Sequence, residues 1–279
     1  MTVKAVADAF AYYKDKEDPA VAVIRAGGAR ASTKDYFQYS IPRTSLAAGA
    51  PGTAQTIQVP IRTDSYFVVT HMFAYSSGIF TAQIRNDADG RYFHSPNSKL
   101  NNVNIFGTLL LPNRLKDPII LPPNGTVSLT LADMANNGTN VVQVVLCGYR
   151  HYDFANPPIP TKNGRRTGWF ALVTDYVLAA NEGPTQLFAK IDAEADFLIR
   201  KLVATSTGEF AARIADAATG DWWSDQPQRN NNLFGTAQYP LILPKPKLIK
   251  AKGSLQIEVT DLSTSQNTLQ IIAEGIKVY

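Results

Sequence analysis

The segment Asn86–Gly90 carries the residue types that most resemble a metal site in this chain. It reads NDADG, and closely spaced oxygen ligands before a glycine are found in calcium-binding loops. An EF-hand frame on this glycine would place Arg85 at the first ligand position and Pro96 at the last, and neither residue can bind calcium. Asp89-Gly90 is instead a typical hairpin turn signal. We therefore predict a turn here, and no metal or other cofactor.

Three acids, Asp192, Glu194 and Asp196, could form a carboxylate cluster, because alternating residues of a strand point to one face. A hydrolase with paired carboxylates needs them across a cleft, with one held protonated by burial. Adjacent acids on one strand are more typical of a solvated face. The three histidines are far apart, and we expect one on a strand surface and two in loops or at strand ends: His71, His94 and His151. No nucleotide-binding or hydrolase motif is found, so the sequence predicts a protein that is not an enzyme.

Trp222 and Trp223 form an aromatic pair that could contact a ligand or a partner. Successive side chains of a strand point to opposite faces, so one ring should enter the core and the other should face outward. An outward ring could stack on a sugar or be buried at a subunit contact. Because no polar cluster is evident nearby, we favour the subunit contact.

The segment PKPKLIKAKG brings four lysines into one stretch of chain: Lys245, Lys247, Lys250 and Lys252. Lysines can contact phosphates, but a nucleic-acid surface would also need arginines and base-stacking aromatics close by. Lysines on an edge strand also prevent pairing with a second sheet. We therefore interpret these four as candidate protein-interface or edge-strand residues, and the pattern argues against nucleic acid as a partner.

The composition is that of an ordinary globular protein, with 45% hydrophobic and 18% charged residues, a net charge of +4 and a pI near 9.0. Such mild basicity does not by itself indicate nucleic acid. Cys147, the single cysteine, cannot form an intramolecular disulfide and is expected to be a small buried hydrophobe. No run approaches the roughly 18 apolar residues of a membrane span, and the charged residues near the N-terminus lead us to expect no signal peptide. We expect synthesis in the cytoplasm without export, and no membrane partner.

The sequence contains an internal repeat. Asp64–Phe93 aligns without a gap on Glu194–Trp223, and the match continues to Tyr152 and to the final residue, Tyr279. Matching positions include Phe67 with Phe197, Gly78 with Gly208, Phe80 with Phe210, Gly90 with Gly220 and Gly148 with Gly275. Each unit is roughly 110 to 120 residues long, a normal size for one domain. We therefore predict the tandem duplication of a whole domain.

Each unit is predicted to be all-β. Runs of strand length, rich in β-branched and aromatic residues, occur at Phe67–Phe73, Phe80–Ile84, Thr126–Leu131 and Val141–Leu146. Clusters of Gly, Pro and Asn separate them. Short strands at this spacing, without a long helix, predict two tandem antiparallel β-sandwiches of jelly-roll type.

An N-terminal arm is predicted to precede the first sandwich. It contains a short helix whose apolar face includes Val6, Phe10 and Tyr13 at helical spacing. A helix this short must dock on its own domain or on a neighbouring subunit, so these three are candidate interface residues. The predicted parts are the arm (1–34), the first sandwich (35–152), a Pro- and Gly-rich linker (153–168) and the second sandwich (169–279).

The pattern of each unit is shared with known proteins. It comprises a Phe-Gly-Thr segment, a Pro-bounded run such as Pro118–Pro122 or Pro240–Pro244, a turn, an alternating strand, and a closing strand with Cys147-Gly148-Tyr149 or Glu274-Gly275-Ile276. This pattern resembles β-sandwich structural proteins of tailed-bacteriophage virions, namely capsid decoration, vertex or head-tail collar components. The resemblance implies a virion protein that forms homo-oligomers and binds other virion proteins, such as a major capsid protein.

Two alternatives stay open. Tandem jelly rolls also resemble the double-jelly-roll major capsid proteins of membrane-containing viruses, although the evident similarity of the two units argues somewhat against this interpretation. The alternative from another class is a β-sandwich module that binds a carbohydrate or a receptor through Trp222 and Trp223.

Overall fold

The computed structural model describes residues 33–47, 53–95, 98–134, 140–159, 161–162 and 165–279. The candidate interface residues Val6, Phe10 and Tyr13 of the predicted arm lie outside these ranges. Residues Tyr36–Tyr279 form one compact unit, distinct from Met1–Asp35.

The described residues form short strands and two four-residue helices. The first half contains β1 (Lys34–Ser40), β2 (Thr44–Leu46), β3 (Gln55–Pro60), β4 (Tyr66–Ser76), β5 (Phe80–Asn86), β6 (Arg91–Tyr92), β7 (Leu100–Asn101), α3 (Asn102–Ile105), β8 (Asn113–Leu121), β9 (Thr126–Asp133) and β10 (Asn140–His151). The second half contains β11 (Thr161–Lys162), β12 (Arg165–Leu178), β13 (Thr185–Lys190), β14 (Asp196–Ser206), β15 (Phe210–Asp216), β16 (Gln228–Arg229), α4 (Asn230–Leu233), β17 (Leu241–Ile249), β18 (Ser254–Asp261) and β19 (Asn267–Val278). No helix among the described residues is long and apolar enough to cross a membrane.

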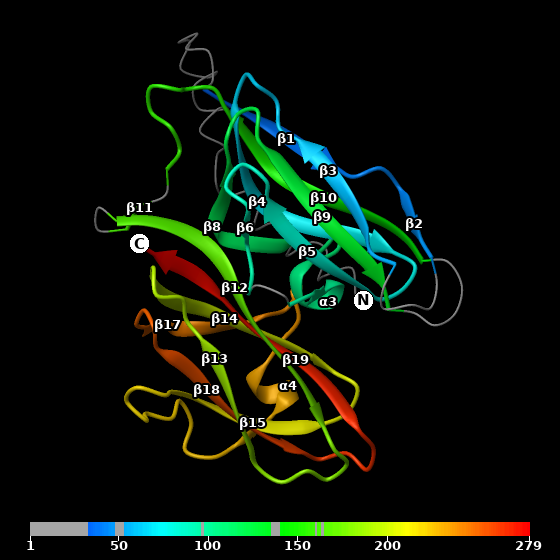
Figure 1. Ribbon diagram of the computed structural model, residues 1–279, viewed down its shortest axis with the longest axis vertical. Coiled ribbons are helices and arrows are strands. Elements are labelled where there is room, and N and C mark those ends of the chain that lie inside the picture. Colours follow the sequence, from blue (N-terminus) through cyan, green and yellow to red (C-terminus); the bar gives the residue numbers. More distant parts are fainter. Residues whose placement is uncertain (1–32, 48–52, 96–97, 135–139, 160, 163–164) are drawn as a thin grey trace, which may run out of the picture. The chain divides into compact units, whose positions relative to one another are not determined.

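Both halves have the same sheet topology (Figure 1). In the first half, one antiparallel sheet has the order β1-β10-β4-β8, with β2 beside β10, and the other has the order β3-β9-β5-β6, with β7 beside β5. In the second half, the orders are β12-β19-β14-β17, with β11 beside β12, and β13-β18-β15-β16. This pairing of strands in two facing sheets is the jelly-roll arrangement. The predicted all-β fold of two jelly-roll sandwiches is confirmed, while their origin by duplication stays a prediction.

Alternating burial along the strands explains why these segments form sandwiches. In β10, Val142, Val144 and Leu146 are buried, whereas Val141 and Val145 are only half-buried. Because successive side chains point to opposite sides of a sheet, the buried set faces the core and the half-buried set faces outward. The first sandwich therefore has an outer sheet face that its own core does not use.

The sheet β12-β19-β14-β17 is different, because both of its faces are covered. In β19, Ile271 and Ala273 belong to the core of the second sandwich, whereas Ile272 between them belongs to the core of the first. Burial is accordingly almost continuous along this strand, as in sheets that are packed on both sides. The contact between this sheet and the first sandwich is called the joint below.

Two matched glycines allow the strands to approach closely at a shift of register. A Cβ atom on Gly148 would lie 1.9 Å from the carbonyl oxygen of Val68, and one on Gly275 would lie 2.0 Å from that of Leu198. The register of β10 against β4 shifts at Gly148, and that of β19 against β14 shifts at the residue opposite Gly275. Both matched positions therefore require the absence of a side chain.

Gly275→Ala is expected to lower the free energy of unfolding by about 1–3 kcal/mol, because the new methyl group must push two paired strands apart. Urea denaturation followed by fluorescence would measure this change in the free energy of unfolding. Gly183→Ala is the matched control, since a Cβ atom there would meet nothing within 4 Å. Equal stability of the two variants would show that the sheet yields at the bulge without cost.

Candidate functional site: the joint between the two sandwiches

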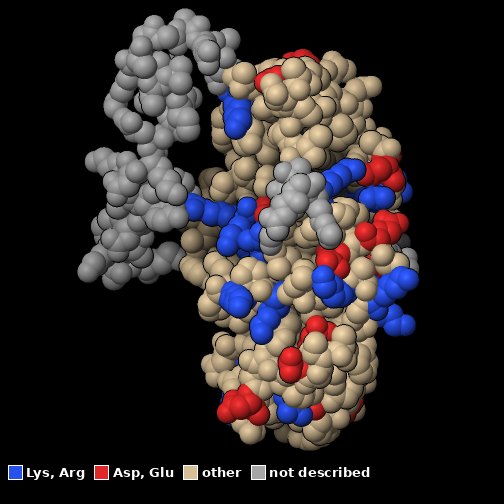
Figure 2. Space-filling model, turned by 90° about the vertical axis from the view of Figure 1, so that its left-hand side faces the viewer, with Lys and Arg blue, Asp and Glu red and all other residues tan. Residues whose placement is uncertain are grey.

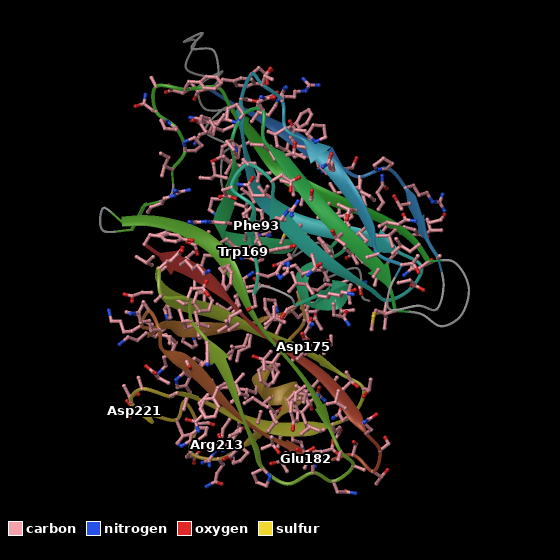
Figure 3. The ribbon with its side chains drawn as sticks, in the orientation of Figure 1. Phe93, Trp169, Asp175, Glu182, Arg213 and Asp221 are labelled. Carbon is pink, nitrogen blue, oxygen red and sulfur yellow. The ribbon has the colours of Figure 1, made fainter. Side chains whose placement is uncertain are left out.

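The centre of the joint is apolar. Trp169, Ala171 and Val203 come from the second half, yet they belong to the hydrophobic core of the first sandwich, and Phe93 packs against the same core. Trp169 is only 6% exposed. Figure 3 shows Phe93 and Trp169 next to each other where the two sandwiches meet. The joint thus has a buried centre of the kind that holds a single domain together.

Main-chain hydrogen bonds also cross the joint. The Ala171 N–H donates to the Phe93 carbonyl (3.0 Å), and the Ser95 N–H donates to the Ala171 carbonyl (3.0 Å). The Val173 N–H donates to the Ser95 hydroxyl oxygen (2.9 Å). The segment that follows β6 therefore pairs with β12 as a short additional strand.

His94 lies within this segment and is fully buried. Its Nε2 accepts the Ile84 N–H (3.2 Å), and an N–H group can only donate, so Nε2 carries no proton. The proton must be on Nδ1, which donates to the Ser95 carbonyl (3.0 Å). Burial lowers the pKa of His94 to about 4, with the hydrogen bond to Ser95 opposing the shift. The prediction of a loop or strand-end histidine did not anticipate this buried, neutral ring.

Gln270 of β19 is the polar centre of the joint. Its amide nitrogen donates to the Lys99 carbonyl (2.7 Å) and to the Asp175 carboxylate (2.7 Å). Its amide oxygen accepts the Asn101 N–H (2.8 Å) and the Asn104 side-chain amide (3.2 Å). Burial raises the pKa of Asp175, and the bond from Gln270 opposes that shift. Three of these four hydrogen bonds, those to Lys99, Asn101 and Asn104, link the two sandwiches, and the fourth stays within the second sandwich.

A buried ion pair lies beside the apolar centre. The Lys201 ammonium donates to the Arg114 carbonyl (2.6 Å) and the Asn113 side-chain oxygen (3.1 Å), and lies 3.4 Å from the Glu274 carboxylate. Lys201 and Glu274 come from the second half, whereas both hydrogen-bond acceptors come from the first. Burial raises the pKa of Glu274, and the charge of Lys201 opposes this shift. The ammonium of Lys201 therefore has its two hydrogen-bond acceptors only while the joint is closed.

The four candidate lysines lie on β17 and the turn that follows it, and all four are exposed. β17 is the edge strand of its sheet. Lys250 pairs with Asp196 (3.0 Å), and Lys247 lies 5.6 Å from the centre of the Trp223 ring. Figure 2, which views the side on which β17 lies, shows basic and acidic side chains interspersed. A role for Lys245, Lys247, Lys250 and Lys252 at a protein interface stays a prediction.

The two candidate tryptophans face opposite sides of the second sandwich. Trp223 is half-buried and packs against the core. Trp222 pairs with Ala215 at an isolated bridge, and the Arg213 guanidinium lies 4.0 Å from the centre of its ring. Arg213 therefore occupies one face of the ring that a sugar would need.

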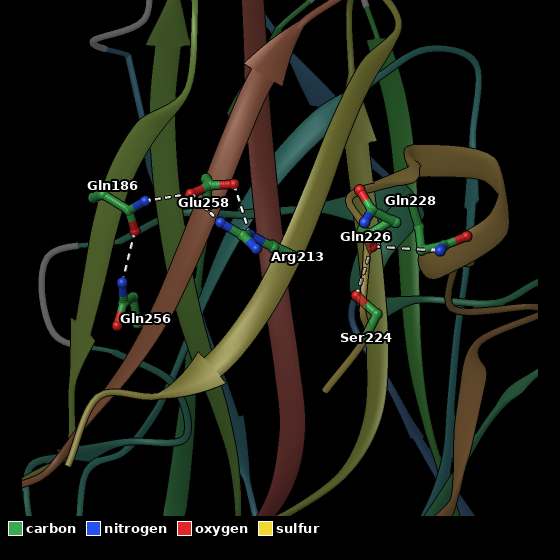
Figure 4. Close-up of polar contacts among 7 residues, drawn as sticks. All are labelled: Gln186, Arg213, Ser224, Gln226, Gln228, Gln256 and Glu258. Carbon is green, nitrogen blue, oxygen red and sulfur yellow. Dashed lines mark hydrogen bonds and ion pairs between the residues drawn. The ribbon is translucent and has the colours of Figure 1, made fainter. Parts of the chain in front are cut away.

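Arg213 belongs to a polar row that crosses β15, β18 and β13 (Figure 4). Its guanidinium donates twice to the Glu258 carboxylate (2.7 and 2.9 Å), which also accepts the Gln186 amide (2.6 Å). Gln256 donates to the oxygen of Gln186 (2.8 Å). Hydrogen bonding to Arg213 lowers the pKa of Glu258, and burial opposes this shift. Such cross-strand pairs stabilise a sheet, and because they satisfy one another we interpret the row as structural.

The predicted solvated acids each have a basic partner. Asp192 pairs with Lys277, and Glu194 lies 3.5 Å from Arg91. Asp192 and Glu194 lie in the turn between β13 and β14, so the three acids do not share a strand face. Among the described residues, no group of three or more His, Cys, Asp or Glu side chains could hold a metal ion.

The expectation that Cys147 is a buried hydrophobe is wrong. Its side chain is half-buried, and its sulfur lies 3.9 Å from the Tyr36 hydroxyl. The neighbours Leu146 and Val144 alternate with it and fill the core. Cys147 therefore belongs to the outer face of β10.

Comparisons with known proteins give a fold likeness only. No protein-family model and no curated protein matches this chain. Among solved structures, the major capsid protein P2 from Bacteriophage PM2 is 13% identical, with a TM-score of 0.45 over 88% of this chain and 98% of that one. PNGase F, a glycosylasparaginase from Flavobacterium meningosepticum, is 9% identical, with a TM-score of 0.42 over 88% and 96%. A223, a turret protein in Sulfolobus turreted icosahedral virus, is 10% identical, with a TM-score of 0.23 over 86% and 98%. At these sequence identities and TM-scores, both a capsid protein and an enzyme are similar to the chain, so the similarity does not indicate a function.

Proposed function

We propose that this chain is a virion structural protein that works by binding copies of itself and other virion proteins. The observation that carries the proposal is the joint, which fixes two jelly-roll sandwiches to each other through an apolar centre, Gln270 and the Lys201–Glu274 pair. Jelly rolls are a common fold of viral shell proteins. A fixed spacing of two such sandwiches is what a shell subunit needs in order to present its contact surfaces reproducibly.

The joint favours one of the virion roles predicted from the sequence. A decoration or collar protein can function as separate modules on a linker, whereas a double-jelly-roll capsid subunit requires both sandwiches to form one rigid block. Residues Tyr36–Tyr279 form one compact unit, which supports such an arrangement. We therefore favour a capsid subunit over a decoration, vertex or collar component.

The carbohydrate- or receptor-binding alternative has less support. Trp222 has Arg213 over its ring, and Trp223 packs into the core of the second sandwich. Neither tryptophan therefore presents two free faces to a sugar. Glycan binding that is lost in Trp222→Ala while the fold is retained would revive this alternative.

Self-association of the purified full-length chain tests the proposal. We expect sedimentation velocity to show discrete oligomers that grow with protein concentration, and negative-stain electron microscopy to show rings, sheets or closed particles. Mass spectrometry should also find the chain in purified virus particles. A chain that stays monomeric at all accessible concentrations and is absent from particles would refute the virion role.

A further inference from the structure

The loop after each short helix has the same turn but different surroundings. In the second half, the Thr236 N–H donates to the Tyr239 carbonyl (3.2 Å), and in the first half the Thr108 N–H donates to the Leu111 carbonyl (3.1 Å). Each turn follows a Phe-Gly segment and precedes a proline. The two loops are therefore equivalent residue by residue, which places Leu109 at the position of Ala237.

Ala237 is part of the joint, whereas Leu109 has no such cover. Ala237 is 2% exposed, and its N–H donates to the carbonyl of Val103 in α3 (3.0 Å). Leu109 is 74% exposed, and its neighbour Leu110 is 80% exposed. The apolar surface of these two adjacent leucines is exposed to water, and its burial at an interface would be favourable.

The two residues that form the polar contact of the joint each have an equivalent residue in the other half of the chain. Within the joint, the Asn104 amide of α3 donates to Gln270 of β19 (3.2 Å). The equivalent residues in the other half are Asn232 of α4, which is exposed, and Gln143 of β10, which is half-buried. The strand equivalence is fixed by Asn140 and Asn267, which open β10 and β19 and donate to matched aspartates (3.0 and 3.1 Å). The chain thus contains two equivalent Asn–Gln pairs. Within the described residues, Asn104 and Gln270 are hydrogen-bonded to each other, whereas Asn232 and Gln143 lie on separate surfaces.

The two aromatic residues of the joint also have equivalents in the other half of the chain. Trp169 and Phe93 meet in the joint, and their equivalents are Tyr36 and Trp223. Tyr36 is 67% exposed on β1, and Trp223 is half-buried, with the Lys247 ammonium 5.6 Å from the centre of its ring. Tyr75 of β4, which faces the same way as Tyr36, is also strongly exposed. Each aromatic residue of the joint therefore has an aromatic counterpart in the other half of the chain.

We propose that these two surfaces bind each other between copies of this chain. The outer face of the first sandwich is formed by Tyr36, Tyr75, Gln143, Val145 and the Leu109–Leu110 loop tip. It packs on the α4 end of the second sandwich of a neighbouring copy, which is formed by Trp223, Asn231 and Asn232. The occupant is a second copy because the joint already joins the equivalent surfaces within one chain. This inference rests on the proposed function and names the surfaces through which it acts.

The contact joins different surfaces of two copies, so it is head-to-tail. Repetition of such a contact produces a closed ring if the rotation closes, and a filament if it does not. The position of the Lys201–Glu274 ion pair is taken by His71 and Cys147 on the outer face, and that of Asn113 by Leu241 on the α4 end. The contact between copies therefore lacks the buried ion pair of the joint.

The double variant Leu109→Asp/Leu110→Asp tests the proposal by sedimentation equilibrium of the full chain. Two charges buried in an apolar contact should raise the dissociation constant of self-association at least about thirtyfold, the effect of losing an interface hot spot. The melting temperature should not change, because both side chains are exposed in the single chain. Phe154→Asp is the matched control, since Phe154 is also exposed but packs against Tyr66, at the other end of β4 from α3.

A charge complement gives a second measurement. Adding Asn231→Lys/Asn232→Lys to the aspartate variant places lysines opposite the new acids and should restore part of the association, and the restored part should be lost in high salt. If the aspartate variant associates like wild type, the interface lies elsewhere and this inference is overturned, while the proposed function stands. If wild type does not associate at all, this inference is overturned. The proposed function is overturned as well only if the chain is also absent from purified particles.

Discussion

Lys201→Met should lower the free energy of unfolding by about 3–5 kcal/mol, because it leaves the Glu274 carboxylate buried without its counter-charge. The carbonyl of Arg114 and the side-chain oxygen of Asn113 also lose their donor. A buried acceptor without a partner destabilises the fold by its full desolvation free energy. Urea denaturation at neutral pH measures the loss.

Two further variants separate the ion pair from general damage. Lys201→Met/Glu274→Leu should recover at least half of the loss, because an apolar pair of similar volume contains no unpaired charge. Lys250→Met is the surface control, since its partner Asp196 is held in an exposed pair, and it should cost at most about 1 kcal/mol. If Lys201→Met is no more costly than Lys250→Met, the joint does not depend on the buried charges.

Acid should weaken the joint through His94. Its pKa is lowered to about 4 in the folded chain, so between pH 6.5 and pH 4 the unfolded chain binds a proton that the folded chain does not. The contribution of His94 to stability is therefore complete above pH 6.5 and falls with pH by about 3 kcal/mol toward pH 4. A proton on Nε2 would also break the hydrogen bond from the Ile84 N–H.

Comparison with His94→Gln isolates this contribution. The variant cannot titrate, so the stability difference between wild type and variant should shrink by about 3 kcal/mol from pH 7 to pH 4. Titration of the His94 ring protons by NMR should give a midpoint near pH 4. A midpoint near 6.5, or a stability difference that does not vary with pH, would contradict a buried neutral ring.

The fold could be predicted because its signals are local. Glycines such as Gly148 and Gly275 mark positions where two backbones meet, and the sequence aligns them directly. Strand-length apolar runs appear as β4, β5, β9 and β10, as their residue types predict. These features depend on neighbours in the chain and need no knowledge of the tertiary arrangement.

The joint could not be predicted, because the same residue types occur at buried and exposed copies of one position. Gln270 holds the joint together, whereas Gln143, its equivalent, is half-exposed on the outer face of β10. His94 stands between an aromatic residue and a serine in an irregular segment, and only pairing with β12 buries it. One signal was available: Glu274 interrupts the apolar run IIAEGI, and a charge inside a buried strand needs a partner.

The ion pair of the joint is also expected to favour one order of sandwiches in the proposed assembly. Lys201 finds its acceptors at Asn113 and Arg114, and the second half has Leu241 at the position of Asn113. A second sandwich that packed on the α4 end of another second sandwich would bury Lys201 against leucine, at a cost of several kcal/mol. We therefore expect the buried charge to disfavour contacts between two second sandwiches relative to contacts between a first and a second sandwich.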